Sequence, residues 1–435
     1  MVRRISGVAI LLFVSASLWA AEPETVVIKA ARMFDGRGEA VSSPAFVVVT
    51  GSRIEAVGSD SAVPAGARVI DFGDATLLPG FIDAHVHLTG ESSDNWFRDF
   101  FQGVMRFPAE QAHYAALYAK RTLQAGFTTV RNVGADDYVD VGLRNAINAG
   151  IAEGPRMLVA IHAIGSTGGH GDGSPIPPDR RLPRGPIQGV CNGADECRAA
   201  VRYQIKYGAD VIKCMPSGGV LSLGDPVDAP EMTQDEVNAI VEEAHHWGRK
   251  VAAHIHGDEA GRVAIKAGVD SIEHGSFMKP DTLAQMKAKG IYLVPTLLAG
   301  ETVVAQASKF PPAIAAKGKA AVAARTDMFR NALKGGVRIA FGTDSAVSTH
   351  GTNAQEFALM VDLGMSPAAA LKSATASGAD LLGLAKEIGT IEKGKSADLV
   401  AVPGNPLSDI KQTEKVFFVM KEGKVVRNGQ TNRIP

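Results

Sequence analysis

Several residues that can bind a metal ion stand at or beside the ends of short apolar runs in this chain. Four are histidines and the others are a lysine and an aspartate: His85, His87, Lys213, His254, His274 and Asp344. Alternate residues of a strand point to the same side, so His85 and His87 would face one cavity. Neutral imidazole is a good ligand for zinc and similar ions. Burying these groups without partners would be costly, and a shared metal site removes that cost.

The apolar runs themselves predict buried parallel strands. They cover residues 80–87, 128–132, 157–162, 211–214, 251–256, 271–274, 292–297 and 339–344. Helical patterns separate several of them, such as the one that is capped at Thr233 and reaches Gly248. Eight strands that alternate with helices predict an α/β fold, a (β/α)₈ TIM barrel whose strand ends meet at one face. A doubly wound open sheet is the alternative, but metal-binding residues at so many strand ends favour the barrel.

Both ends of the chain are rich in short strand-like runs separated by turns. We expect residues 22–79 and 391–435 to form one small β-sandwich module, and residues 80–390 to form the barrel. The length of 435 residues suits one barrel with a small added module.

The first residues predict a secretory signal peptide. Arg3 and Arg4 precede an apolar run over residues 8–14, and small residues end at Ala20 and Ala21. The run is shorter than the ~20 apolar residues that a membrane span needs. We therefore expect residues 1–21 to be removed, the protein to be secreted or periplasmic, and no stable membrane insertion to remain. A retained N-terminal anchor is the alternative.

Composition narrows the class of protein further. A formal net charge of -1 argues against a nucleic-acid partner, and 46% hydrophobic residues allow a large core. Export would permit a disulfide between Cys191 and Cys197, although two free thiols are equally compatible with the sequence. Cys214 lies in an apolar run and is expected to pack as a small buried side chain.

The ordered set His85-Val86-His87, Lys213, His254, His274 and Asp344 resembles the ligand set of the amidohydrolase superfamily. Residues 77–83 resemble the lead-in to the first barrel strand of that family, and residues 394–400 resemble its return to the β module. Four further segments resemble the branch of Xaa-Pro dipeptidases, imidazolonepropionase-like enzymes and ochratoxin-type amidases: residues 126–131, 217–220, 272–275 and 294–297. The resemblance covers nearly the whole chain. Asn132 departs from it, because relatives often have aspartate there.

The resemblance implies two divalent metal ions, with zinc favoured, and hydrolysis of an amide bond. His85 and His87 would bind the more buried ion, and His254 and His274 the other. Lys213 would carry a carboxyl group from CO₂, as N6-carboxylysine, and bridge the two ions. Asp344 would contact the first ion and act as general acid and base while a bridging hydroxide attacks the carbonyl. The substrate would be a small amide or dipeptide, such as Xaa-Pro, or an N-acyl amino acid, including ochratoxin-like amides. Relatives often assemble into homo-oligomers.

Further residues are candidates for contact with substrate. His162 and His170 could bind a substrate carboxylate or stabilise an oxyanion, or they could be held by local hydrogen bonds alone. Gly218 and Gly219 could offer backbone N–H groups to substrate, or they could only permit a tight turn. For His256, a supporting role at the site and exposure to solvent are both open.

Arg131 is expected to form an ion pair inside the barrel mouth, although it could bind substrate.

Other functions remain open at this point. A mononuclear deaminase would not need Lys213 as a bridge, and a cyclic-amide hydrolase would use the same metal site. A periplasmic metal-binding protein without turnover is the alternative from another class, but the full ligand set with Asp344 favours an enzyme.

Overall fold

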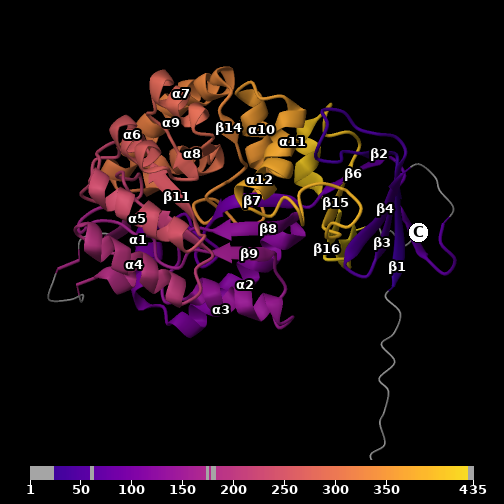
Figure 1. Ribbon diagram of the computed structural model, residues 1–435, viewed down its shortest axis with the longest axis horizontal. Coiled ribbons are helices and arrows are strands. Elements are labelled where there is room, and N and C mark those ends of the chain that lie inside the picture. Colours follow the sequence, from indigo (N-terminus) through magenta and orange to yellow (C-terminus); the bar gives the residue numbers. More distant parts are fainter. Residues whose placement is uncertain (1–23, 59–62, 173–175, 178–182, 430–435) are drawn as a thin grey trace, which may run out of the picture.

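The computed structural model describes residues 24–58, 63–172, 176–177 and 183–429. The expected signal peptide, residues 1–21, lies outside these ranges. In Figure 1 the helices and the parallel strands occupy one side of the molecule, and strands from both ends of the chain lie together on the other. Within the described ranges, none of the helices has the length and the apolar content needed to cross a membrane.

Eight parallel strands alternate with helices, so the predicted α/β fold is confirmed. One sheet orders β10 (Val211–Cys214), β11 (Lys250–Ile255), β12 (Ser271–His274), β13 (Tyr292–Val294) and β14 (Arg338–Ile339). A second sheet orders β7 (Phe81–Val86), β8 (Phe127–Asn132) and β9 (Arg156–Val159). In the described residues these two sheets are joined by single bridges, Ile164 to Cys214 and Val86 to Ser345, and not by one continuous ladder.

Three of the predicted strands, β9, β13 and β14, end earlier than the apolar runs suggested. The backbone turns left-handed at Ile161, with φ of 63°, and at Thr296, with φ of 49°. A strand cannot continue through that conformation, so β9 stops at Val159 and β13 stops at Val294, just before these turns. β14 stops at Ile339. The apolar residues that follow these strands are still buried, so the pattern of apolar residues alone predicted longer strands.

Helices follow most of these strands. The α-helices are α1 (Trp96–Met105), α2 (Pro108–Gln124), α3 (Val139–Asn148), α4 (Ala194–Lys206), α5 (Gln234–His246), α6 (Asp258–Ala267), α7 (Pro280–Ala288), α8 (Leu297–Ala305), α9 (Pro312–Gly335), α10 (Gln355–Asp362), α11 (Pro367–Ser373) and α12 (Ala376–Leu381). Short 3₁₀ helices are η1 (His170–Asp172), η2 (Pro186–Gln188), η3 (Ala307–Lys309) and η4 (Ile410–Lys415). The predicted cap of α5 is confirmed, because the Thr233 side chain accepts from Glu236 N while Thr233 N donates to the Glu236 carboxylate at 2.7 Å.

The two ends of the chain build two further sheets. One orders β4 (Arg53–Gly58), β3 (Ala45–Thr50), β1 (Thr25–Ala30) and β5 (Arg68–Asp71). The other orders β17 (Lys424–Asn428), β16 (Phe418–Lys421), β15 (Leu399–Pro403), β6 (Ala75–Pro79) and β2 (Arg32–Met33). Leu78 pairs with Val400, so strands from both chain ends share that sheet. Buried side chains of both sheets, such as Val47 and Phe418, form one hydrophobic cluster.

The cysteines resolve an alternative that the sequence left open. Cys191 and Cys197 form a disulfide, which ties the segment before α4 to the first turn of that helix. Cys214 is a buried free thiol in β10, as its apolar surroundings predicted.

Candidate metal centre

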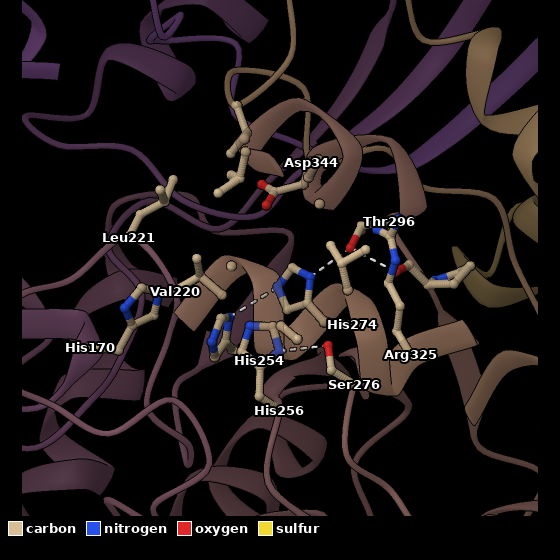
Figure 2. A pocket seen from close by; sticks show the side chains of 18 residues that line it. His170, Val220, Leu221, His254, His256, His274, Ser276, Thr296, Arg325 and Asp344 are labelled. Carbon is tan, nitrogen blue, oxygen red and sulfur yellow. Dashed lines mark hydrogen bonds between the residues drawn. The ribbon is translucent and has the colours of Figure 1, made fainter. Parts of the chain in front are cut away.

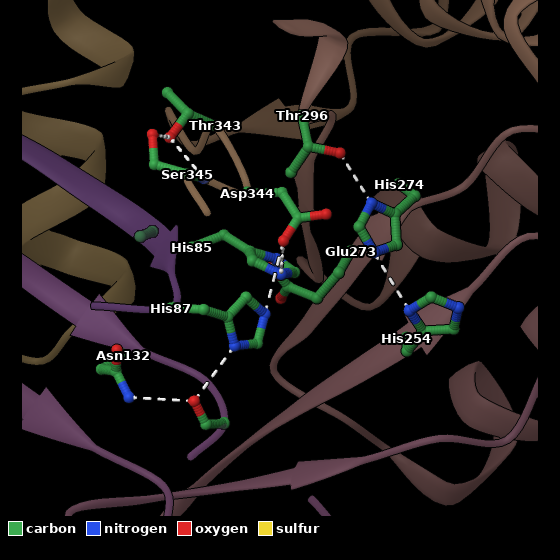
Figure 3. A network of polar contacts seen from close by, with 12 residues as sticks. His85, His87, Asn132, His254, Glu273, His274, Thr296, Thr343, Asp344 and Ser345 are labelled. Carbon is green, nitrogen blue, oxygen red and sulfur yellow. Dashed lines mark hydrogen bonds and ion pairs between the residues drawn. The ribbon is translucent and has the colours of Figure 1, made fainter. Parts of the chain in front are cut away.

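The ends of four strands bring predicted ligands together. His85 lies on β7, His254 on β11 and His274 at the end of β12, while Asp344 follows β14. The ring centroids of His85 and His274 are 5.0 Å apart, and those of His254 and His274 are 4.6 Å apart. Asp344 Oδ1 lies 3.4 Å from His85 Nε2 and 3.3 Å from His87 Nε2 (Figure 3). Five of the six predicted ligands therefore form one cluster.

Lys213, the sixth, is buried in β10 beside the same cluster. It is in register with Ala252 of β11, which faces the same side as His254 two residues later. Burial lowers the pKa of Lys213, and the charges of Glu273 and Asp344 oppose that shift. We find no hydrogen bond or ion pair of Lys213 Nζ to any described residue.

A left-handed backbone at two ligands directs side chains into the site. His274 has φ of 69° and Asp344 has φ of 57°, values that non-glycine residues rarely adopt outside functional sites. In a regular strand the consecutive residues Glu273 and His274 would point to opposite sides. The turn at His274 lets both Glu273 and His274 approach His85. The His85 ring contacts the His274 ring, and His85 Nδ1 lies 2.7 Å from Glu273 Oε2.

Glu273 is a functional residue that the sequence analysis missed. It is fully buried between two partners, with Arg131 Nη2 at 2.8 Å from Oε1 and His85 at Oε2. The predicted ion pair of Arg131 is thereby confirmed. Burial alone would raise the pKa of Glu273, but the Arg131 charge and the His85 hydrogen bond outweigh it and lower that pKa to about 2. An ionised carboxylate only accepts, so His85 Nδ1 donates to Glu273, and Nε2 is the ring nitrogen that faces Asp344.

The same reasoning applies to His87. Its Nδ1 lies 3.1 Å from the carbonyl oxygen of Gly134, which can only accept. His87 Nδ1 therefore donates, and Nε2 is the ring nitrogen left to bind a metal ion; it faces Asp344 Oδ1 as well. One carboxylate oxygen and two imidazole nitrogens thus converge on one point, and together they would stabilise a bound cation.

His254 and His274 also direct one ring nitrogen each toward a common point (Figures 2 and 3). Thr296 Oγ1 donates to the Pro295 carbonyl at 2.8 Å, so it must accept from His274 Nδ1 at 2.6 Å. His254 Nε2 is 3.3 Å from the Gly218 carbonyl and must donate to it. The remaining nitrogens, His254 Nδ1 and His274 Nε2, then face each other as lone pairs at 3.0 Å.

The electrostatic surroundings keep the rings of His254 and His274 neutral. Burial, reinforced by neighbouring positive groups, lowers the pKa of both His254 and His274 well below the usual value. Metal binding requires neutral imidazole and ionised carboxylate, so the donor set fits a divalent cation. Two groups have ligand atoms within 4.8 Å of one another: His85 with His274 and Asp344, and His254 with His256 and His274.

His256 is buried, so the alternative of solvent exposure is wrong for this residue. Its Nδ1 lies 2.9 Å from Ser276 Oγ, and its ring stacks on His274 with centroids 5.0 Å apart. Burial lowers its pKa to about 3. The spacing of two residues from His254 on one strand was the signal that placed it on the same side.

A pocket with an empty volume of about 570 Å³ opens beside the imidazoles. Figure 2 shows His170, His254, His274 and Asp344 around it, with apolar side chains such as Val220. The His170 ring lies 4.4 Å from that of His254, and burial lowers its pKa to about 4. Both predicted substrate histidines line an adjoining hollow, where His162 Nδ1 is 3.3 Å from Gln204 Oε1.

Gly218 and Gly219 are at the site, but their N–H groups are already engaged. Gly218 N donates to the Ala229 carbonyl at 3.0 Å, and Gly219 N donates to Asp225 Oδ2 at 2.9 Å. A Cβ on Gly219 would lie 2.2 Å from the His170 ring. In this conformation Gly219 therefore provides space for His170, and neither glycine offers a free donor to substrate.

Comparison with known proteins agrees with this geometry. Residues 76–426 match the model of the amidohydrolase family. The chain belongs to this family. The amidohydrolase is 33% identical to ochratoxinase of Aspergillus niger over 430 residues, which cover 93% of this chain and 87% of that protein.

Two solved structures are also similar to this amidohydrolase. A crystal structure of a Xaa-Pro dipeptidase with bound methionine in the active site has 40% identity and a TM-score of 0.88, and covers 93% of this chain and 100% of that one. A prolidase complexed with N-methylphosphonate-L-proline has 30% identity and a TM-score of 0.85, with 93% and 100% covered. The amidohydrolase is thus a hydrolytic enzyme that acts on amide C–N bonds, and the histidine-rich cluster is its potential metal site.

Proposed function

We propose that this amidohydrolase is a binuclear metal-dependent hydrolase of dipeptides such as Xaa-Pro or of N-acyl amino acids, including ochratoxin-like amides. The observation that carries the proposal is the pair of facing lone pairs on His254 and His274, together with Asp344 facing His85 and His87. Similarity to a Xaa-Pro dipeptidase and to ochratoxinase supports the substrate class.

In this proposal His85, His87 and Asp344 hold one ion, and His254 and His274 hold the other. Lys213 would help to hold both ions as N6-carboxylysine, since a carbamate is an anion with two oxygen donors whereas an ammonium group would be repelled. Zinc suits such a donor set. When bound, the ions would supply a hydroxide nucleophile at neutral pH and polarise the substrate carbonyl.

The residues of the chain have separate roles. Asp344 accepts a proton at its carboxylate during attack on the amide and returns it to the leaving amine. Glu273 keeps the proton of His85 on Nδ1 and so fixes the orientation of that ring. Ser222 Oγ donates to Asp225 Oδ2 at 2.7 Å and accepts from His170 Nδ1, which leaves His170 Nε2 as an acceptor for a substrate N–H group. His162 contacts the substrate from the adjoining hollow.

A substrate panel with metal-reconstituted protein tests the proposed reaction. Xaa-Pro dipeptides, N-acyl amino acids and ochratoxin-like amides should be cleaved, while cyclic amides and aminated bases should not. Hydrolysis confined to cyclic amides, or release of ammonia from a base, would contradict it.

Lys213→Ala tests the bridge directly. We expect the variant to lose most of its bound metal and its activity, and a short carboxylic acid to restore part of both. Full metal content in Lys213→Ala would count against a bridging role.

We further propose that the parallel strands close as a TIM barrel over residues 80–390, beside a β-sandwich formed by residues 22–79 and 391–435. We also propose export after removal of residues 1–21, and assembly as a homo-oligomer. The disulfide between Cys191 and Cys197 supports an oxidising compartment. N-terminal sequencing of protein from the periplasm or the medium tests export, and an intact Met1 in a cytoplasmic fraction would contradict it.

A further inference from the structure

Helix α1 is an unusual feature because it contains no buried residue. Its apolar side chains are spaced at i, i+3, i+4 and i+7, which places them on one face. Six large apolar residues in α1 and just after it are exposed, and we call them the α1 patch: Phe97, Phe100, Phe101, Val104, Met105 and Phe107. Phe97 is 68% exposed, Phe101 63% and Phe107 75%.

A short helix with an exposed apolar face needs a partner to cover that face. An isolated helix of fewer than about 12 residues is only marginally stable in water, and α1 has ten. Among the described residues, the ring contacts of the α1 patch come from within α1: Trp96 contacts Phe97 and Phe100, with ring centroids 5.2 and 5.3 Å apart, and both phenylalanines stay exposed. At roughly 150–250 Å² for each aromatic side chain, the α1 patch exposes on the order of 700 Å². A stable interface buries about 800 Å² on each partner.

The charges around the α1 patch point to a second copy of this chain. One end of the helix carries Asp94 and Arg98, which are 3.5 Å apart, and the other carries Arg106 and Glu110, which are 3.4 Å apart. An antiparallel pair of α1 helices would place Asp94 beside Arg106 of the partner subunit, and Arg98 beside Glu110 of the partner subunit. Both ends would gain opposite charges at the rim of an aromatic centre, as protein interfaces prefer.

The same charges argue against a lipid surface. Helices that lie on membranes carry an excess of lysine and arginine on their polar face. Asp94, Asp99 and Glu110 are balanced here by Arg98, Arg106 and Lys309, which pairs with Asp94 at 3.2 Å, so the helix has no basic excess. An anionic bilayer would therefore gain little from this helix.

We propose that α1 is a homodimer interface in which two copies of the chain pack their α1 patches antiparallel across a two-fold axis. The axis passes near Phe100 and Phe101, at the middle of the helix. This interface does not depend on the proposed reaction, because no residue of the α1 patch lines the pocket or the metal centre.

Cross-linking tests the geometry. Cys191 and Cys197 are paired and Cys214 is buried, so one introduced cysteine would be the reactive thiol among the described residues. Phe101→Cys should form a covalently linked dimer under mild oxidation. Ile151→Cys is the matched control, since Ile151 is 83% exposed on another segment and should stay largely unlinked.

Sedimentation of the full chain, at micromolar concentration and with far-UV circular dichroism as a check of folding, tests the energetics. The wild type should sediment as a dimer or as a larger assembly of dimers. Phe101→Asp should weaken that association by about tenfold or more, as expected for a central aromatic residue, whereas Ile151→Asp should leave it unchanged. A monomeric wild type, an assembly unaffected by Phe101→Asp, or a monomer that binds phosphatidylcholine–phosphatidylglycerol vesicles through Phe101 would overturn the proposal. Amide hydrolysis is assayed separately, so its failure would not be confused with loss of the interface.

Discussion

Glu273 connects two buried residues, Arg131 and His85, through one carboxylate oxygen each. It accepts from His85 Nδ1 at 2.7 Å and pairs with Arg131 Nη2 at 2.8 Å, and all three side chains are at most 1% exposed. Glu273→Gln would leave the Arg131 charge unpaired in the core, which costs roughly 3–5 kcal/mol of unfolding free energy. It should also weaken metal binding about 10- to 100-fold, because the His85 ring loses its fixed orientation.

Chemical denaturation and metal titration measure both effects of Glu273→Gln. The matched control is Asp281→Asn, which breaks the surface pair with Arg262 and should leave stability almost unchanged, because solvent screens that pair. Equal effects of the two substitutions would contradict the structural role of Glu273.

Asp344 has a different role, since it is proposed to move the proton. Asp344→Asn keeps an oxygen ligand and the shape of the side chain, so we expect metal content to be retained while kcat falls by about 10²–10⁴. Metal analysis and steady-state kinetics on the same preparation separate the two properties. An unchanged kcat would refute the role of Asp344 as base.

The residue types at strand ends were sufficient to predict which side chains gather at the site, but not the residues that support them. His85, His87 and His254 could be placed by strand alternation, and the structure brings them together. Glu273 could not, because alternation turns it away from His274, and only the left-handed backbone at His274 brings both residues to His85. Backbone conformation of that kind leaves no mark in the residue pattern of a strand.

At the scale of elements, the loop after β10, which contains Gly219, packs against the earlier loop that contains His170. A Cβ on Gly219 would lie 2.2 Å from the His170 ring, so Gly219→Ala should displace His170. We expect KM to rise several-fold with metal content unchanged, because His170 is proposed to contact substrate. Gly142→Ala in α3 is the control, since nothing lies within 4 Å of its added Cβ, and a helix gains up to about 1 kcal/mol from that change. A KM that rises no more in Gly219→Ala than in the control would refute this role.

Element boundaries followed the sequence where a cap or a turn fixed them. The cap at Thr233 set the start of α5 as predicted. The ends of β9 and β13 were not predictable, because burial continues beyond them while the backbone turns at Ile161 and Thr296. The engaged N–H groups of Gly218 and Gly219 were also beyond sequence reasoning, since their acceptors, Ala229 and Asp225, lie on a later part of the loop.

At the scale of the whole molecule, the order of strands and helices determined where the chemistry gathers. Ligands from residues 85 to 344 meet because parallel strands end at the same face, and this was predictable from the alternation of apolar runs and helical patterns. The sharing of one sheet by both chain ends was likewise expected from their composition, and Leu78 pairs with Val400. The exposed α1 patch belongs to this scale too, because a second copy of the chain would cover it.

The most direct test of the metal centre is a titration of metal-free protein with zinc, in which bound metal and amide hydrolysis are measured together. The facing ring nitrogens of His254 and His274, and those of His85 and His87 beside Asp344, predict that activity is absent without metal and reaches its maximum at two ions per chain. Full activity of metal-free protein, or a maximum at a single ion, would contradict the binuclear centre.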